Sequence, residues 1–100
     1  FFLNYVDFGM NLQESLDAAT VHSVHFASSF YPRESYPGRV ITESRIAAGV
    51  TDELTQKGHE VVSAGAWSNG KVMGIRYDKA RGVIMGAVSP KGNIGYAIGW

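Results

Sequence analysis

The chain has 100 residues, of which 45% are apolar, and nine Lys and Arg balance nine Asp and Glu. The zero formal net charge gives no electrostatic reason to expect nucleic acid or an anionic membrane as a partner. The lack of cysteine excludes disulfides, thiolate zinc sites and a cysteine nucleophile, and no stretch approaches the roughly 20 apolar residues of a membrane span.

The first eight residues are apolar nearly all round, and Phe1, Phe2 and Leu3 stand at the very start. A helix with this pattern is typically buried inside a larger body. Aromatic side chains at a frayed terminus would be exposed to water, which an independent domain seldom tolerates. We therefore interpret this segment as a cut through a helix whose earlier turns are missing.

A short amphipathic helix is predicted to follow. Gly9 is a suitable residue to end the first helix, and Asn11 with Glu14 three residues later is a capping-box pattern. The apolar face of the second helix is expected to consist of Leu12, Leu16 and Ala19.

The middle of the chain predicts a strand, a loop, a second strand and a helix. The expected ranges are 21–26 for the first strand, 27–38 for the loop and 39–43 for the second strand. Ser44 is expected to cap a helix that runs to about Lys57, with Ile46, Val50 and Leu54 as its apolar stripe. Gly58 is expected to end this helix in a left-handed conformation.

The last third of the chain is predicted to be β-structure. The expected strands are 59–66, 71–77 and 83–88, separated by turns at 68–70 and 78–82. Residues 83–88 lack polar alternation, which is typical of a strand covered on both faces. Because the chain has too few helices to cover both faces, we expect another chain or a missing segment to supply a layer.

Three stretches in this order carry a family resemblance. The first is Asn4-Tyr5-Val6-Asp7-Phe8-Gly9-Met10-Asn11-Leu12-Gln13-Glu14-Ser15-Leu16-Asp17-Ala18, the second is Leu54-Thr55-Gln56-Lys57-Gly58-His59-Glu60-Val61, and the third is Gly86-Ala87-Val88-Ser89-Pro90-Lys91 with the closing Gly95-Tyr96-Ala97-Ile98-Gly99-Trp100. Together they resemble the end of the small subunit of γ-glutamyltranspeptidases and span nearly the whole chain.

Several positions depart from the family pattern. Where the family usually has Pro-Arg-aromatic-His-His, this chain has Ala19, Thr20, Val21, His22 and Ser23. Ser89 stands where the family has Asp, and Lys91 where it has Arg, while the loop over 28–38 is unfamiliar. These departures indicate a divergent γ-glutamyltranspeptidase-like subgroup.

The resemblance implies an α+β fold, with residues 1–100 as a single fragment from the C-terminal part of an N-terminal nucleophile hydrolase αββα sandwich. It comprises short helices and a hairpin-rich piece of sheet. Such enzymes cleave themselves from one precursor, and the Thr exposed at the new terminus attacks a γ-glutamyl amide. The α-amine of that Thr acts as base, and backbone N–H groups stabilise the oxyanion. The acyl group then passes to water, an amino acid or a peptide.

None of these catalytic parts maps to this chain. Thr20, Thr42, Thr51 and Thr55 are internal and lack a free α-amine. The resemblance places the oxyanion glycines and the substrate-binding residues upstream of Phe1. We therefore expect no catalytic, substrate-binding or metal-binding residue here, no cofactor, and an isolated chain without activity.

Two constellations were weighed against this interpretation. His22 and His25 could suggest a metal site, but their spacing in a strand puts them on opposite faces, so packing or surface roles are favoured. By residue type, Ser29, His59 and Asp78 could form a Ser-His-Asp catalytic triad, but no nucleophile-elbow pattern surrounds the serine.

Two further segments have competing interpretations. Gly92, Gly95 and Gly99, and the Gly70-Lys71 pair, are better explained as turn residues than as a phosphate loop. The loop carrying Phe30, Tyr31, Arg33 and Tyr36 could contact another chain segment, because aromatic residues and Arg are enriched at interfaces, or could fold onto its own protein.

The expected partners are the remainder of the same enzyme and a small γ-glutamyl substrate, with a homo-oligomer also open. The sequence is also compatible with two alternatives, namely a cephalosporin-acylase-like amidase of the same fold and a stand-alone dimerising module. The composition is compatible with a cytoplasmic and with a periplasmic or extracellular location.

Overall fold

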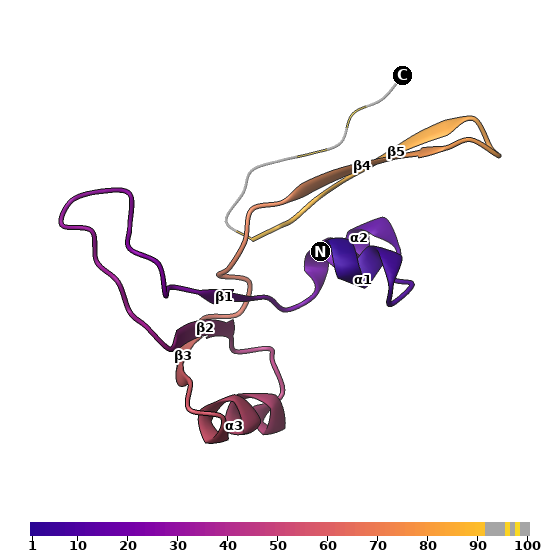
Figure 1. Cartoon of the computed structure of the whole chain (residues 1–100). Helices are drawn as coiled ribbons and strands as arrows, with labels where there is room; N and C mark the ends of the chain where they lie inside the picture. The colour runs from indigo at the N-terminus through magenta and orange to yellow at the C-terminus, as the bar shows by residue number, and fades with distance from the viewer. Residues whose placement is uncertain (92–95, 97, 99–100) are drawn as a thin grey trace. The chain divides into compact units, whose positions relative to one another are not determined.

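The structure, a computed structural model, describes residues 1–91, 96 and 98 of the chain. It forms two compact units (Figure 1), one from Phe1–Ala18 with Gly70–Trp100 and the other from Ala19–Asn69. Among the described residues, no helix combines the length and the apolar character needed to cross a membrane.

The first unit is built around the β-hairpin of β4 (Met73–Asp78) and β5 (Val83–Val88). The two strands are antiparallel and pair from Met73 opposite Val88 to Asp78 opposite Val83. The carboxylate of Asp78 accepts hydrogen bonds from the backbone N–H groups of Ala80 and Arg81 at 3.1 and 3.2 Å. The predicted hairpin is confirmed, because local turn chemistry determines it.

Two short helices belong to the same unit, α1 (Phe2–Val6) and α2 (Leu12–Asp17). Gly9 follows α1 with a φ of +67°, a left-handed conformation that favours glycine. The Asn11 side chain accepts from the Glu14 backbone N–H at 2.9 Å, and the Glu14 carboxylate accepts from the Asn11 N–H at 3.0 Å. The predicted capping box is therefore present.

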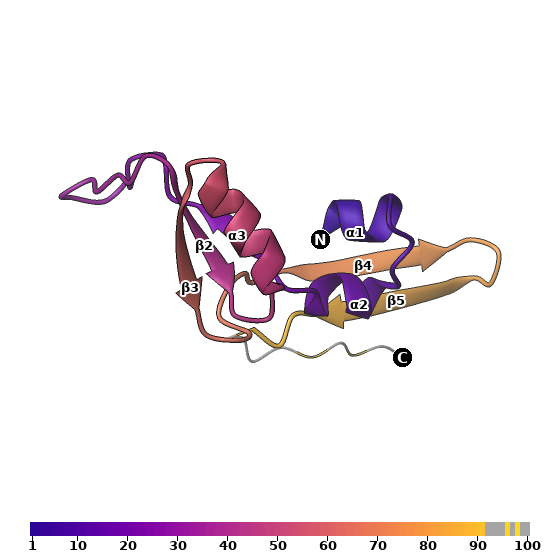
Figure 2. The same ribbon diagram turned by 90° about the horizontal axis from the view of Figure 1, so that it is seen from below.

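The two helices lie over one face of the hairpin (Figure 2). Leu16 of α2 and Ala87 of β5 are buried between them. Gly74 allows a close approach, because a Cβ atom there would lie 3.0 Å from Phe1 Cζ and 3.1 Å from Leu12 Cδ1. The α1–α2 pair and the hairpin thus form a helix layer on a strand layer.

The second unit has a three-stranded sheet in the order β1 (Val21–Ser23), β2 (Arg39–Glu43) and β3 (Glu60–Ala64). β1 is antiparallel to β2, whereas β3 is parallel to β2. The helix α3 (Ala48–Gln56) connects β2 to β3 and packs on β3. This β2–α3–β3 arrangement is a crossover unit, as parallel neighbours require.

The predicted start of α3 at Ser44 is wrong. The N-cap is Ala47, which makes no side-chain cap bond, and the Ser44 N–H instead donates to the Ala64 carbonyl at 3.0 Å. Ser44 therefore extends the pairing with β3, and Ile46 lies outside the helix. Within α3, Thr51 and Leu54 are half-buried while Val50 is exposed, so the predicted stripe is only partly correct.

The other boundaries agree with the expectations to within a few residues. β1 ends at Ser23 rather than at residue 26, and residues 24–38 form an irregular loop. Gly58 has a φ of +92°, as expected for the residue that ends α3. Gly92, Gly95 and Gly99, and most of the closing segment matched at 95–100, lie outside the described residues.

Candidate functional site

One face of the β4–β5 hairpin is not covered by any helix among the described residues. Cross-strand pairing places Gly74 with Ala87 on the face under the helices, so the alternate positions must point the other way. Those positions carry large apolar side chains, which are 59 to 81% exposed: Met73, Ile75, Tyr77 and Ile84. We call these four residues the bare face.

The bare face is a strongly apolar part of the hairpin surface. A hollow of about 930 Å³ opens along it, and Tyr96 and Ile98 also line this hollow. Burial of a large apolar side chain stabilises by roughly 1.5–3 kcal/mol, and contiguous apolar patches on soluble proteins mark interaction sites. The bare face therefore has the chemistry of an interface.

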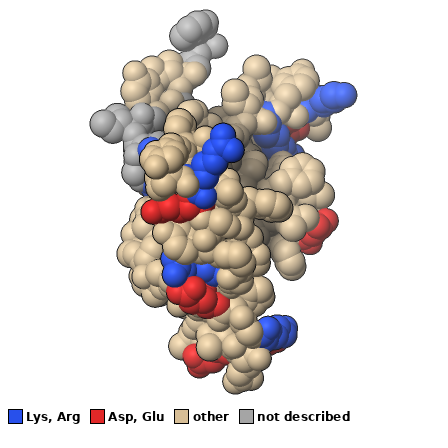
Figure 3. Space-filling view, turned by 60° about the vertical axis from the view of Figure 1, so that its left-hand side comes forward, with Lys and Arg blue, Asp and Glu red and all other residues tan. Residues whose placement is uncertain are grey.

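The rest of the chain supports this conclusion. Leu16, Val40 and Ala87 are the only buried hydrophobic residues in the described part of the chain. The outward side of α1 and the turn after it also expose Phe2, Leu3, Val6 and Phe8. Acidic and basic side chains are interspersed over the face shown in Figure 3.

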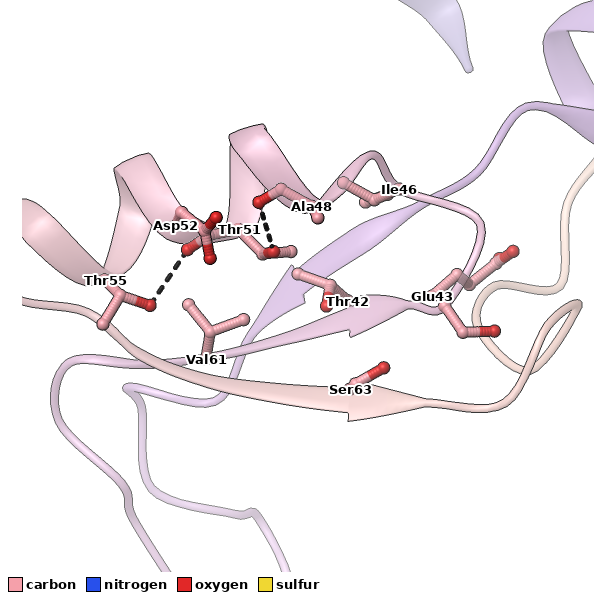
Figure 4. A pocket seen from close by; sticks show the side chains of 10 residues that line it. Thr42, Glu43, Ile46, Ala48, Thr51, Asp52, Thr55, Val61 and Ser63 are labelled. Carbon is pink, nitrogen blue, oxygen red and sulfur yellow. Dashed lines mark hydrogen bonds between the residues drawn. The ribbon is translucent and has the colours of Figure 1, made fainter.

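A second candidate site lies in the β2–α3–β3 unit. A pocket of about 430 Å³ opens between α3 and the two strands (Figure 4). Val61 and Ser63 rise from β3 toward the helix, and Thr51 faces them from α3. The lining is dominated by hydroxyl groups and includes one carboxylate from α3; its residues are Thr42, Glu43, Ser44, Ile46, Ala48, Thr51, Asp52, Thr55, Val61 and Ser63.

Thr42 is the exceptional residue of this pocket. It is 1% exposed, and its Oγ1 atom has no hydrogen-bond partner among the described residues. Thr51 and Thr55 differ, because their hydroxyls donate to the helix carbonyls of Ala48 and Thr51 at 2.8 and 2.9 Å. An unsatisfied buried hydroxyl costs about 1–3 kcal/mol, so the Thr42 hydroxyl is poised to accept a partner.

The carboxylate of Glu43, next to Thr42, is fully buried and held from several sides. Thr20 donates to it at 2.8 Å, and Arg45 Nε donates at 3.0 Å. The Trp67 backbone N–H lies 3.3 Å from the same group, and the Arg45 guanidinium stacks 3.6 Å above the Trp67 ring. This cluster fixes the loop after β3, where Trp67 has a φ of +61°.

At the other end of β2, Arg39 donates to Glu60 at 2.8 Å across the parallel pair. This hydrogen bond lowers the pKa of Glu60 and raises the pKa of Arg39. The Arg39 guanidinium also lies 4.0 Å above the Tyr36 ring. Tyr36 is thus joined to the sheet, which explains its position at the end of the irregular loop.

The residues weighed as metal ligands or as a triad have other surroundings. No group of three His, Cys, Asp or Glu in the described ranges is arranged to hold a metal ion. The His25 and His59 rings lie 6.4 Å apart, and His59 Nδ1 is 3.3 Å from the Gly38 carbonyl oxygen. Asp78 holds the hairpin turn, so it has a structural role of its own.

The irregular loop presents its aromatic residues to solvent. Phe26, Phe30 and Tyr31 are each more than 80% exposed. Arg33 adopts a φ of +61° and donates its N–H to the Phe30 carbonyl at 2.7 Å. Both interpretations of this loop, as a contact to another segment and as a surface loop, remain predictions.

Sequence reasoning missed the burial of several polar residues, three of which matter most for the sites and the packing. Thr42, Glu43 and Lys91 are each at most 2% exposed. Thr42 and Glu43 lie in a strand predicted correctly, but their burial depends on α3 and on the loops around the strand. Lys91 was singled out only as a departure from the family pattern, without any signal of its contact.

The comparisons agree with this architecture. The sequence model of the family described as gamma-glutamyltranspeptidase matches residues 1–100. The structures of LmbA2991T421A and LmbA2991HD each match 95% of the chain with 39% identity and a TM-score of 0.85. The chain spans 16% of the length of those proteins. A search of curated proteins finds no significant match.

Two more distant structures share the fold. The match to cephalosporin acylase from Bacillus halodurans covers 90% of this chain and 15% of the acylase chain, with 22% identity and a TM-score of 0.68. The match to the Bacillus anthracis transpeptidase CapD covers 98% of this chain and 52% of the CapD chain, with 19% identity and a TM-score of 0.68. This likeness in fold, together with the mixed short helices and strands of the described residues, confirms the predicted fold class.

Proposed function

The chain belongs to the gamma-glutamyltranspeptidase family, and from this premise we propose that residues 1–100 form the C-terminal part of the small subunit of an enzyme that cleaves γ-glutamyl amides. The nucleophile is the Thr at the start of that subunit, upstream of this chain. Its α-amine takes the proton of the hydroxyl, and the Thr oxygen attacks the γ-glutamyl carbonyl carbon. The amide C–N bond breaks as the leaving amine takes that proton, which leaves the acyl-enzyme. Water, an amino acid or a peptide then gives up a proton to the α-amine, attacks the ester and receives the γ-glutamyl group, and the Thr hydroxyl is restored.

The bare face of the hairpin is the observation that carries this proposal. One face of β4–β5 is covered by α1 and α2, while Ile75 and Ile84 on the other face stand 81 and 74% exposed. An αββα sandwich needs this arrangement, because each sheet buries one face against helices and the other against the second sheet. The remainder of the enzyme supplies that second sheet.

In this assignment the chain contributes scaffold rather than chemistry. Thr20 and Thr42 are internal residues within hydrogen-bonded structure, so neither offers the free α-amine that the mechanism requires. The apolar surface of α1 and the turn after it, where Phe2 and Phe8 are exposed, extends the contact with the same enzyme. The partners of the chain are therefore the upstream part of the small subunit and the large subunit.

The test uses the complete protein that contains these 100 residues. We expect it to release p-nitroaniline from γ-glutamyl-p-nitroanilide, to lose this activity when the N-terminal Thr of the small subunit is replaced by Ala, and to be inactive as residues 1–100 alone. Cleavage of the side-chain amide of a cephalosporin, without release of p-nitroaniline, would instead identify an amidase.

The alternative of a stand-alone module makes a different prediction. A module that covers its bare face with a second copy would fold cooperatively as a dimer of residues 1–100. Analytical ultracentrifugation of this chain decides the point, because a well-folded dimer would contradict the proposed role within a larger enzyme.

A further inference from the structure

The pocket lies between α3 and the two strands of the crossover unit, and it extends to the carboxyl ends of β2 and β3. β2 and β3 are parallel, and α3 begins shortly after the carboxyl end of β2. Open α/β units bind ligands outside the carboxyl ends of their strands. Thr42 and Ser63, which are direct neighbours in the register, lie near these ends and line the pocket.

The polar groups of the pocket define what it could recognise. The Thr42 hydroxyl is buried and without a partner among the described residues, so its hydrogen-bonding capacity is unused. The hydroxyls of Thr51 and Thr55 donate to their own helix, which leaves their oxygen lone pairs as acceptors toward the pocket. Acceptors therefore outnumber free donors.

The charge of the pocket lining also favours a ligand that donates hydrogen bonds. Asp52 contributes a carboxylate, and no ion pair joins it to a cation in the part of the chain that the structure describes. No Lys or Arg lines the pocket. An anion would thus meet a negative charge without compensation, whereas an ammonium group would find a partner.

We infer that this pocket binds a small hydroxylated amine, whose ammonium group pairs with Asp52 and whose hydroxyl groups bond to Thr42 and its neighbours. The volume of about 430 Å³ lies in the range of small-molecule sites. Ile46, Ala48 and Val61 supply apolar walls for the carbon skeleton. This site is separate from the acyl-transfer chemistry, and no step of that chemistry passes through it.

Ligand-observed NMR on the complete protein tests the inference with glucosamine as the probe. Glucose, which has the hydroxyls without the charge, and glucuronate, which has the opposite charge, are the matched comparisons. We expect saturable binding of glucosamine and weaker binding of glucose and glucuronate. Equal binding of glucose and glucosamine would overturn the pairing with Asp52.

Two variants and one control identify the pocket. Thr42→Val removes the unpaired hydroxyl and keeps the shape of the side chain, whereas Asp52→Asn removes the negative charge. Each variant is expected to weaken glucosamine binding roughly tenfold or more, because each removes a buried or charge-assisted hydrogen bond. Glu53→Gln, which removes a carboxylate of α3 that lies outside the pocket lining, is expected to bind as the wild type. Circular dichroism confirms that each variant is folded.

The outcome is independent of the proposed enzyme activity. A wild-type protein that releases p-nitroaniline but shows no saturable glucosamine binding would overturn the pocket assignment and leave the proposed function standing. Binding that persists unchanged in Thr42→Val and Asp52→Asn would place the ligand elsewhere and would overturn the assignment too.

Discussion

Lys91 donates a hydrogen bond of 2.6 Å from its Nζ atom to the backbone carbonyl oxygen of Ala18, 73 residues earlier in the chain. Lys91 is 2% exposed, and Ala18 is the C-cap residue of α2. The segment that leaves β5 is therefore tied to the end of the helix that packs on the hairpin. A carbonyl at a helix end needs such a partner, because it has none within the helix.

Replacement of this lysine tests that link. Lys91→Met keeps the apolar stem but removes the donor, and we expect it to destabilise the protein by about 1–3 kcal/mol, the cost of leaving a buried carbonyl unpaired. Urea unfolding of the complete protein measures the loss. Lys79→Met at the exposed hairpin turn is the control, and an equal loss in both variants would refute the role of the hydrogen bond.

The buried Glu43 carboxylate is expected to matter more than an exposed one. Glu43→Gln leaves Arg45 without its charge partner, and breaking a buried pair costs about 3 kcal/mol. Glu53→Gln breaks an exposed pair with Lys57, 2.6 Å apart, and is expected to cost about 0.5 kcal/mol or less. The same unfolding measurement compares the two, and a similar change in both would contradict the structural role of the Glu43 cluster.

Two glycines are expected to respond in opposite directions to alanine. A Cβ at Gly74 would lie 3.0 Å from Phe1 Cζ, so Gly74→Ala forces the helix layer away and is expected to destabilise by about 1 kcal/mol or more. Gly49 lies within α3 with open space around it, so Gly49→Ala is expected to stabilise by about 0.5–1 kcal/mol. Melting temperatures that move in the same direction would count against this packing.

The Arg39–Glu60 pair predicts a pH dependence in acid. The pKa of Glu60 lies below its ordinary value of 4.5 because Arg39 hydrogen-bonds its carboxylate. The stabilisation is therefore present above the unfolded pKa and is lost as the pH falls through the folded one. The raised pKa of Arg39 keeps its contribution complete at any lower pH, so it adds no dependence in this range.

Glu60→Gln isolates that effect. The difference in melting temperature between the wild type and Glu60→Gln is expected to favour the wild type at pH 7 and to shrink as the pH falls below the ordinary pKa of a glutamate and through the lowered pKa of Glu60 in the folded state. A difference that stays constant over this range would show that the ion pair contributes nothing.

The features predicted correctly are those that neighbouring residues determine. The cap of α2 needs only Asn11 and Glu14, the end of α3 needs only Gly58, and the turn at Asp78 follows from its own side chain. The start of α3 was mispredicted because the backbone bond from Ser44 to Ala64 competes with the capping role of a serine. The pairing with β3 therefore determines where α3 begins.

The candidate sites depend even more on distant partners. The parallel pairing of β2 and β3 places Thr42 beside Ser63, and neither sequence segment contains a signal for that register. The apolar run over 83–88 did indicate a strand with two covered faces. In the described chain only one of them is covered, by α1 and α2, and the second cover is what the proposed function assigns to the rest of the enzyme.

Chemical labelling of Ile75 tests the bare face most directly. With Ile75→Cys in the complete protein, modification by iodoacetamide is followed at this position by peptide mass spectrometry, and Lys79→Cys at the exposed turn gives the reference rate. We predict that position 75 is protected in the native enzyme and reacts as fast as position 79 only after unfolding. Labelling of position 75 at the reference rate in the native, active enzyme would contradict the burial of this face.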